Sequence, residues 1–219
     1  MYTPRFNQVS DRTLLLEAMR SYSFAILFGP VESADEAPAP VATHLPLLVK
    51  DEGEHGTLLG HFARANAHWS ALAGRETLVV FPGPHSYVTP ELYTEPLSVP
   101  TWNYIAIHAW GKLALMEDAD ARIALLEELI EKHDPAYLKR WRVMPDGFRR
   151  TMLAGTVGFS IPIVRIEGKF KLSQNRAPEE RCNIQAALAA GSADQQELAR
   201  WMARLGETNE PAAQQNPTK

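Results

Sequence analysis

The sequence contains a single cysteine, Cys182, among its 219 residues. One thiol cannot close an internal disulfide and cannot supply a thiolate cluster for zinc. The seven histidines also lack the spacing of metal ligands on one helix face, so no metal site is expected. We therefore expect a fold without covalent cross-links, as is usual in a reducing cytoplasm, with Cys182 as an ordinary helix residue.

Long apolar runs are also missing. No stretch approaches the ~20 continuous apolar residues of a membrane-spanning helix. The first residues, Met1 to Phe6, lack the basic and apolar regions of a signal peptide. The protein is therefore expected to be cytoplasmic and to have no membrane partner.

Neither sign of charge dominates, because the sequence has 22 Lys and Arg residues and 26 Asp and Glu residues, which gives a formal net charge of -4. No overall positive field draws the chain to nucleic acid, so any contact with DNA has to be local. The densest basic segment is 138–150, in which five basic residues accompany one acid, Asp146. It lacks a helix-turn-helix pattern, so a solvated surface is the first interpretation and a DNA contact the second. The basic residues are Lys139, Arg140, Arg142, Arg149 and Arg150.

Several common enzyme signatures are absent: the phosphate loop, the dinucleotide fingerprint, the nucleophile elbow and the His-Glu-x-x-His pair. No catalytic residue is identified, so the sequence leaves open whether the protein is an enzyme. Hydrophobic residues make up 45% of the chain and charged residues 22%, which suits one packed domain with appendages.

Hydrophobic periodicity predicts strands interleaved with short helices. Ser10 or Asp11 is expected to cap the first helix, and Asp118 or Asp120 a later helix through 123–130. Gly29-Pro30 and Pro82-Gly83-Pro84 are expected to end the strands before them, with a loop over 31–40. The predicted strands are 22–28, 41–49, 57–60, 77–81, 101–116 and 157–172, and further predicted helices are 62–72, 144–153, 178–190 and 193–205.

The two longest predicted strands indicate the architecture. In 101–116 an aliphatic face is formed by odd positions, and the opposite face carries aromatic and polar residues at even positions. The first face is expected to be core, and the second suits a partner subunit or a flat ligand. The aliphatic residues are Ile105, Ile107, Leu113 and Leu115, and those of the opposite face are Trp102, Tyr104, His108, Trp110 and Lys112. In 157–172 the apolar positions change phase, which a bulge near 162–164 would explain. Without the regular strand-helix alternation of a parallel sheet, the prediction is a mainly β fold with α additions, an antiparallel barrel.

Polar segments interrupt these strands and are the candidates for chemistry. His61 and Arg64 are expected at a strand-to-helix junction, where free backbone amides and the helix dipole favour a phosphate, although an ordinary surface arginine is the alternative. Segment 171–176 combines Lys, Ser, Gln, Asn and Arg without an acid, as an anion site or merely a polar strand end. Thr43 and His44 interrupt a strand that should be buried, where a hydrogen-bonded core histidine is the alternative. Trp102 and Asn103 combine stacking area with amide hydrogen bonding, although a dimer interface would explain the tryptophan as well.

Taken together and in order, five segments resemble the PaiB-type family of FMN-binding negative transcriptional regulators. They are 42–47 (ATHLPL), 56–66 (GTLLGHFARAN), 79–90 (VVFPGPHSYVTP), 99–111 (VPTWNYIAIHAWG) and 169–176 (KFKLSQNR). The resemblance covers about residues 1–181 and departs at Ala67, where the family more often has proline.

The resemblance implies an antiparallel split β-barrel of the FMN-binding type with peripheral helices, a homodimer, and FMN in the cleft between subunits. The sequence is therefore divided into a split-barrel FMN-binding domain over 1–176 and, from the composition of the rest of the chain, a helical extension over 177–207 and a polar tail over 208–219. The resemblance places His61, Arg64 and Asn66 near the flavin phosphate or ribityl chain, Thr43 and His44 along the flavin ring, and Trp102 and Asn103 close by. Lys171, Gln174, Asn175 and Arg176 would approach the cofactor, from the second subunit if not from their own.

Three functions follow as hypotheses. The first is a regulatory FMN-binding protein, with DNA bound through 138–150 or through a partner. The second is an FMN-dependent oxidoreductase that uses a nicotinamide or a small amine, with His44, His85 and Tyr87 as the nearest candidates for proton handling. The third is a haem-binding protein on the same barrel.

Overall fold

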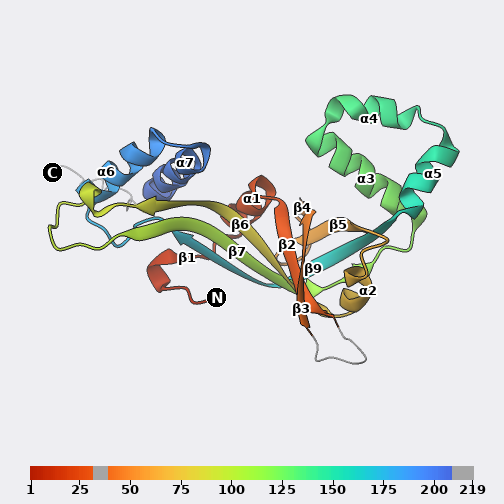
Figure 1. The fold of residues 1–219 in the computed structure, drawn as a ribbon, viewed down its shortest axis with the longest axis horizontal. Coiled ribbons are helices and arrows are strands. Elements are labelled where there is room, and N and C mark those ends of the chain that lie inside the picture. The colour runs from red at the N-terminus through yellow and green to blue at the C-terminus, as the bar shows by residue number, and fades with distance from the viewer. Residues whose placement is uncertain (32–38, 209–219) are drawn as a thin grey trace, which may run out of the picture. The chain divides into compact units, whose positions relative to one another are not determined.

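The computed structural model describes residues 1–31 and 39–208 (Figure 1). The strands are β1 (Gln8–Val9), β2 (Phe24–Val31), β3 (Ala39–Pro46), β4 (Leu48–Lys50), β5 (Thr57–Ala63), β6 (Glu76–Val88), β7 (Thr101–Lys112), β8 (Ala114–Leu115) and β9 (Thr156–Lys171). The helices are α1 (Arg12–Ser21), α2 (His68–Leu72), α3 (Ala119–His133), α4 (Pro135–Arg142), α5 (Asp146–Ala154), α6 (Pro178–Ala189) and α7 (Ala193–Thr208), with short 3-10 turns η1 (Arg5–Asn7) and η2 (Pro90–Leu92).

The strands form one sheet in the order β3-β2-β6-β7-β9-β5-β4, and β1 and β8 also pair with β9. The strand β2 pairs antiparallel with β3 and β6, and the same orientation joins β4 to β5, β5 to β9 and β8 to β9. These pairings match the predicted antiparallel sheet.

The chain forms two compact units that share the strands β6, β7 and β9. The first unit holds Met1, Val9–Pro82 and Ala106–Gly168, and the second holds Tyr2–Gln8, Gly83–Ile105 and the chain from Lys169 onward. The predicted division at residues 176 and 207 stays a prediction. The predicted tail over 208–219 lies outside the described residues, apart from Thr208 at the end of α7.

The first helix forms as predicted. The side chain of Asp11 accepts a hydrogen bond from the backbone N–H of Leu14, 3.0 Å away, which satisfies one of the free amides at the helix start. One side of α1 is buried, including Leu15 and Met19, and it packs on β4. Asp118 caps α3 in the same way, with both carboxylate oxygens accepting backbone N–H groups.

Two predicted strand ends are wrong. The strand β2 continues through Gly29-Pro30 to Val31, where Pro30 lies opposite Pro40 of β3. The strand β6 continues through Pro82-Gly83-Pro84 to Val88. Proline ends a strand only where its missing N–H is needed for the ladder, and the pairing of neighbouring strands decides that.

The helix predicted over 62–72 is also mostly wrong, because β5 runs to Ala63 and α2 covers only His68–Leu72. The helix α4 was not predicted. The predicted strand 101–116 is divided into β7 and β8. Ile105 and Ile107 are buried as expected, whereas Leu115 is exposed.

The change of phase in β9 is present. Ile161 and Ile163 are buried, Val164 and Arg165 are both exposed, and Phe170 is buried again on the even positions. Two successive exposed residues thus move the inward-facing positions from odd to even numbers.

Each unit carries its own helices (Figure 1). In the first, α3, α4 and α5 follow one another between β8 and β9, and α3 buries Leu125 and Leu129 against Leu48. In the second, α6 packs on α7, and the Trp201 ring of α7 meets the Phe170 ring edge-on at 5.1 Å. Over the described residues, no helix combines the length and the apolar composition that crossing a membrane requires.

Candidate functional site

The predicted site residues fall into two groups, one in each unit. The first group lies on β3, on β5 and in the segment after β5. The second lies at the start of β7 and in the turn after β9. The first group is Thr43, His44, His61, Arg64 and Asn66, and the second is Trp102, Asn103, Lys171, Gln174, Asn175 and Arg176.

The first group contains a small hydrogen-bonded cluster. The amide of Asn66 donates from Nδ2 to the hydroxyl of Thr43 at 3.3 Å and accepts from the backbone N–H of His68 at 3.0 Å. The Thr43 hydroxyl lies 2.8 Å from His68 Nδ1. The structure therefore brings Thr43 and Asn66 together and adds His68, which sequence reasoning missed and which stands only two residues after Asn66.

His44 does not belong to this cluster. It is exposed on β3, a strand at one end of the sheet order, and its ring faces Phe24 at 6.1 Å. The expectation that it interrupts a buried strand is wrong, because successive side chains of a strand point to opposite faces and His44 takes the outer one. Its contact with a flavin ring stays a prediction.

Two histidines of the first unit, His61 and His68, favour the neutral form at pH 7. Burial lowers the pKa of His61 below its ordinary value of 6.5. Burial also lowers the pKa of His68, with the backbone of Gly29 opposing the effect. The buried Nδ1 of His61 has no hydrogen-bond partner in the protein. His61 can therefore offer a ligand one hydrogen bond, but no positive charge.

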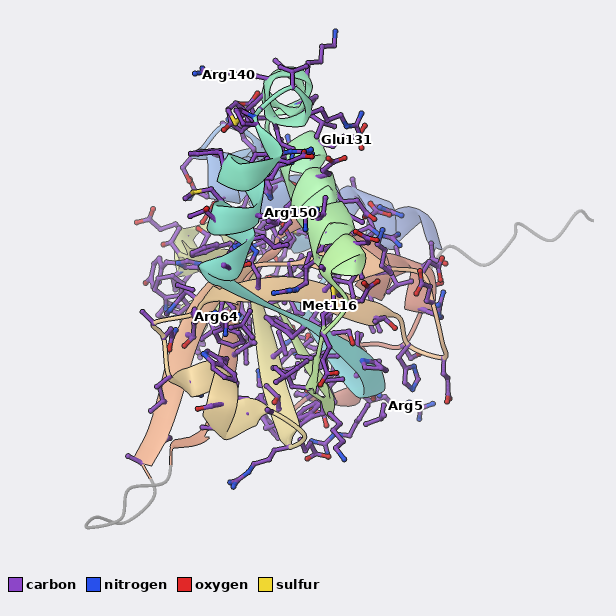
Figure 2. All side chains as sticks on the ribbon, turned by 90° about the vertical axis from the view of Figure 1, so that its right-hand side faces the viewer. Arg5, Arg64, Met116, Glu131, Arg140 and Arg150 are labelled. Carbon is purple, nitrogen blue, oxygen red and sulfur yellow. The ribbon has the colours of Figure 1, made fainter. Side chains whose placement is uncertain are left out.

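Arg64 ties the end of β5 to the start of β9. Its guanidinium donates from Nε to the carbonyl of Ala154 at 2.7 Å and from Nη2 to the carbonyl of Thr156 at 3.1 Å. The helix-dipole argument for this residue is wrong, because α2 starts at His68 and is only five residues long. Figure 2 labels Arg64 on the first unit. Its contact with a phosphate stays a prediction. The two hydrogen bonds use Nε and Nη2, so Nη1 is the guanidinium nitrogen that such a contact would use.

In the second group, Asn103 is a structural residue. It is fully buried, its Oδ1 accepts from the hydroxyl of Ser173 at 3.0 Å, and its Nδ2 lies 4.0 Å from the sulfur of Met202. Ser173 has φ 61°, in the left-handed region that non-glycine residues rarely adopt. The buried amide thus holds a strained turn, and strain of this kind recurs at ligand sites.

We expect Asn103→Ala to destabilise the protein by about 1–3 kcal/mol, because it leaves a cavity and removes the partner of the Ser173 hydroxyl. Urea unfolding followed by tryptophan fluorescence measures this loss. Tyr104→Phe, one residue further along β7, is the matched control and should cost much less. Equal stability of Asn103→Ala and the unmodified protein would contradict the structural role.

The side-chain amide of Gln174 bonds to the backbone of the same turn and of the strand end before it. Its Nε2 donates to the carbonyl of Phe170, and its Oε1 accepts from the backbone N–H of Leu172 at 2.7 Å. Both ends of the amide are therefore engaged by the backbone. Its contact with the cofactor stays a prediction, and its visible role is to shape the turn.

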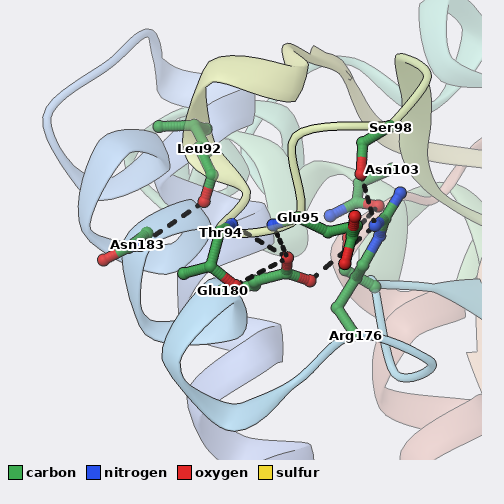
Figure 3. A network of polar contacts seen from close by, with 9 residues as sticks. Leu92, Thr94, Glu95, Ser98, Asn103, Arg176, Glu180 and Asn183 are labelled. Atoms are coloured by element: carbon green, nitrogen blue, oxygen red, sulfur yellow. Dashed lines mark hydrogen bonds and ion pairs between the residues drawn. The ribbon is translucent and has the colours of Figure 1, made fainter.

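The cationic side chains of this group are Lys171 and Arg176. Lys171 Nζ donates to the hydroxyl of Thr101 and to the carbonyl of Trp102. Burial, and then the charges of Lys169 and Arg176, lower the pKa of Lys171. The guanidinium of Arg176 stacks on the Tyr93 ring at 3.7 Å, and its Nη1 lies 3.7 Å from Oε2 of Glu180 (Figure 3). Crowded positive charges of this kind favour a bound anion.

An aromatic surface lies at the start of β7. The Trp102 side chain is 52% exposed, and its ring lies 6.1 Å from the rings of both His85 and Tyr87. Exposed rings grouped in this way are the surface on which a flat heteroaromatic ligand stacks. Among the described residues, no group of three His, Cys, Asp or Glu side chains is placed to hold a metal ion.

Solved structures show which fold this chain shares with known proteins. The flavocytochrome Anf3 of Azotobacter vinelandii matches with a TM-score of 0.57 at 14% identity, over 77% of this chain and 72% of that chain. The conserved hypothetical protein Rv2991 of Mycobacterium tuberculosis matches with a TM-score of 0.52 at 11% identity, over 81% and 94%. The predicted fold, an antiparallel split β-barrel with peripheral helices, is thereby confirmed.

Sequence comparison then defines the family. A family model described as an FMN-binding domain matches residues 1–165. Protease synthase and sporulation protein PAI 2 of Bacillus subtilis is 34% identical over 188 residues, which is 84% of this chain and 87% of that protein. The chain therefore belongs to the PaiB-type family of FMN-binding proteins. The predicted family and the predicted cofactor, FMN, are confirmed.

The residues present fit this cofactor. FMN combines a flat ring, a hydroxyl-bearing chain and a phosphate. Within the second unit, the exposed Trp102 surface suits the ring, and Lys171 and Arg176 suit the phosphate. FMN supplies electron-transfer chemistry when bound, and the protein residues bind and orient it.

Proposed function

We propose that this protein is a homodimeric, FMN-binding negative transcriptional regulator of the cytoplasm. The observation that carries the proposal is the 34% identity to the Bacillus subtilis protein over most of both chains, together with the family match over residues 1–165. The bound flavin would bias the regulatory state of the dimer. The cations Lys171 and Arg176 and the exposed aromatic surface of the second unit support the flavin part of this proposal.

The flavin is tested by the visible spectrum of protein purified without added cofactor. We expect a yellow protein that releases FMN, identified by mass spectrometry, and apoprotein that binds added FMN. Light scattering before and after release tests the dimer. Protein that stays colourless in the presence of FMN would contradict flavin binding, and a strictly monomeric particle would contradict the dimer.

DNA binding is best supported on α4 and α5. Arg142 forms an ion pair with Glu127, and Arg149 pairs with Asp146, so these two charges are partly neutralised. Lys139, Arg140 and Arg150 are exposed, and none of them has an acidic partner within ion-pair distance in the described part of the chain. Figure 2 shows Arg140 on α4 and Arg150 on α5. The basic surface available to phosphates is therefore these three residues.

We expect Arg140→Glu with Arg150→Glu to abolish a mobility shift of duplex DNA from upstream of the protein's own gene. Each single variant should weaken binding and reduce the slope of log affinity against log salt by about 1 for each phosphate that is no longer neutralised. Arg5→Glu, an exposed residue of the second unit, is the control with the same charge change. Absence of any shift at low salt would remove direct DNA binding from the proposal.

A further inference from the structure

The first unit contains a cavity whose described lining includes none of the predicted site residues. It measures about 480 Å³ and lies between the turn 73–74 after α2, the segment 112–115 where β7 ends and β8 begins, and Pro162 and Val164 of β9. This volume is within the range of small-molecule sites. Lys112 is the only charged residue of the described lining, and the others are apolar residues or glycine.

One wall of this cavity is built where the sheet is interrupted. The N–H of Leu113, between β7 and β8, donates to the carbonyl of Arg75 at 3.1 Å, and the Leu113 carbonyl accepts from the N–H of Gly74 at 2.8 Å. Gly74 has φ 72°, in the left-handed region that favours glycine. These backbone groups are already bonded to one another, so this wall offers a ligand apolar contact rather than hydrogen bonds.

Apolar side chains of this cavity are exposed. Val164 is 66% exposed and Leu115 is 38% exposed. Pro162 and Val164 lie two residues apart on β9, so they point to the same face of the strand, and both are exposed. Exposed apolar groups gathered around a hollow gain free energy when a ligand covers them.

Lys112 gives this apolar cavity a positive charge. The side chain is exposed and has no acidic partner within ion-pair distance in the part of the chain that the structure describes. A Cβ atom added to Gly74 would lie 3.9 Å from the Lys112 Cε, so the lysine chain passes beside the turn. Arg165 adds positive charge to the same face, because its guanidinium stacks at 3.6 Å on Trp110, two residues before Lys112 on β7.

The lining indicates the chemistry of the ligand. An apolar hollow suits an alkyl chain or an apolar ring, and an unpaired ammonium group beside it suits an anionic group at one end of the ligand. One ammonium group compensates one negative charge, which favours a carboxylate over a doubly charged phosphate. A second copy of the chain fits less well, because a two-fold contact centred on the cavity would bring two Lys112 side chains together without an acid among the lining residues.

We propose that this cavity binds a small hydrophobic carboxylate, such as a medium-chain fatty acid. The apolar chain lies against Leu115 and Val164, and the carboxylate pairs with Lys112. The inference goes beyond the proposed function, since none of the residues assigned to the flavin lines this cavity.

The test is calorimetric titration of the purified protein with octanoate and with octanol, which share the alkyl chain and differ in charge. Lys112→Met should weaken octanoate by about 5-fold, the upper end for an exposed ion pair, and leave octanol affinity unchanged. Lys139→Met removes an exposed lysine of α4 and is the matched control, which should change neither affinity. Failure of the unmodified protein to bind octanoate, or equal octanoate affinity of Lys112→Met, would overturn the proposal.

The apolar wall is tested by Val164→Asp, which should weaken both ligands by about 10-fold or more, because the ligand chain loses its apolar contact. Val143→Asp makes the same change at a valine that is 82% exposed outside the cavity, and should leave both affinities unchanged. Equal effects of the two variants would contradict the proposal. Neither titration depends on FMN, whose binding the visible spectrum decides separately.

Sedimentation velocity of Val164→Asp distinguishes a ligand from a second copy of the chain. A particle mass equal to that of the unmodified protein supports the ligand. Dissociation of a dimer by this variant would show that the cavity is a subunit interface and would overturn the proposal.

A further measurement uses the unmodified protein, in case a variant does not fold. Reductive methylation followed by mass spectrometry should modify Lys112 more slowly when octanoate is present, relative to the exposed Lys139. Equal modification of Lys112 with and without octanoate would count against the site.

Discussion

Gly111→Ala is expected to destabilise the protein by about 3 kcal/mol or more, at the upper end of what overpacking costs. A Cβ atom at this position of β7 would lie 2.2 Å from the carbonyl oxygen of Pro162 and 2.6 Å from a methyl group of Ile161. Both belong to β9, the neighbouring strand. A backbone oxygen cannot turn away as a side chain can, so the two strands have to separate.

Chemical unfolding of Gly111→Ala measures this effect. Gly147→Ala in α5 is the matched control, because, apart from the adjoining residues and the backbone of its own helix, nothing lies within 4 Å of the added Cβ. In a helix this change should be neutral or stabilise by up to about 1 kcal/mol. A Gly111→Ala protein as stable as the control would show that β7 and β9 are not packed as closely as the structure has them.

The free energy of unfolding is expected to fall as the pH is lowered from 7.5 to 5.5. Burial lowers the pKa of His61, His68 and His108. At His108 the positive N-terminus lowers the pKa further, whereas the negative charge of Glu167 raises it. In the unfolded chain these groups return to 6.5, so below that pH the unfolded state binds protons that the folded state does not. Stability is therefore complete above pH 6.5 and is lost as the pH falls toward the folded pKa values.

Each histidine contributes at most about 1.4 kcal/mol per pH unit, and His61 and His108 less, since they are only half-buried and solvent screens them. His61→Gln and His108→Gln should each flatten the dependence of unfolding free energy on pH. His133→Gln, on the exposed end of α3, should leave it unchanged. Constant stability from pH 7.5 to 5.5 would contradict the burial of these rings.

The sequence patterns predicted well the helices whose caps and apolar sides lie within the helix itself or next to it in sequence. The first helix shows its cap, Asp11, and its apolar side in sequence, and the two C-terminal helices differ from 178–190 and 193–205 by only a few residues. The helix α4 carried the same kind of signal, since Asp134 caps it and Pro135 occupies its first turn.

The ends of elements that pair with distant parts of the chain were predicted poorly. Gly29-Pro30 is typical of a strand end, yet β3 pairs with β2 through and beyond it. The segment 62–72 has helical composition, yet the ladder with β9 keeps β5 extended to Ala63. Pairing across a sheet outweighs the small local preferences of the residues involved.

By itself, the sequence determined the family, the cofactor class and an antiparallel barrel, because these follow from ordered motifs and from the period of the apolar residues. Only the tertiary structure decided which polar residues are free to meet a ligand. In the structure Asn103 is buried, the side chain of Gln174 bonds to the backbone of its own turn, and Arg64 donates to two backbone carbonyls. The tertiary structure also brings Gly74 and Val164 to one cavity, although they lie far apart in the sequence. A residue's type states which bonds it can make, but the fold decides which of them the protein itself already uses.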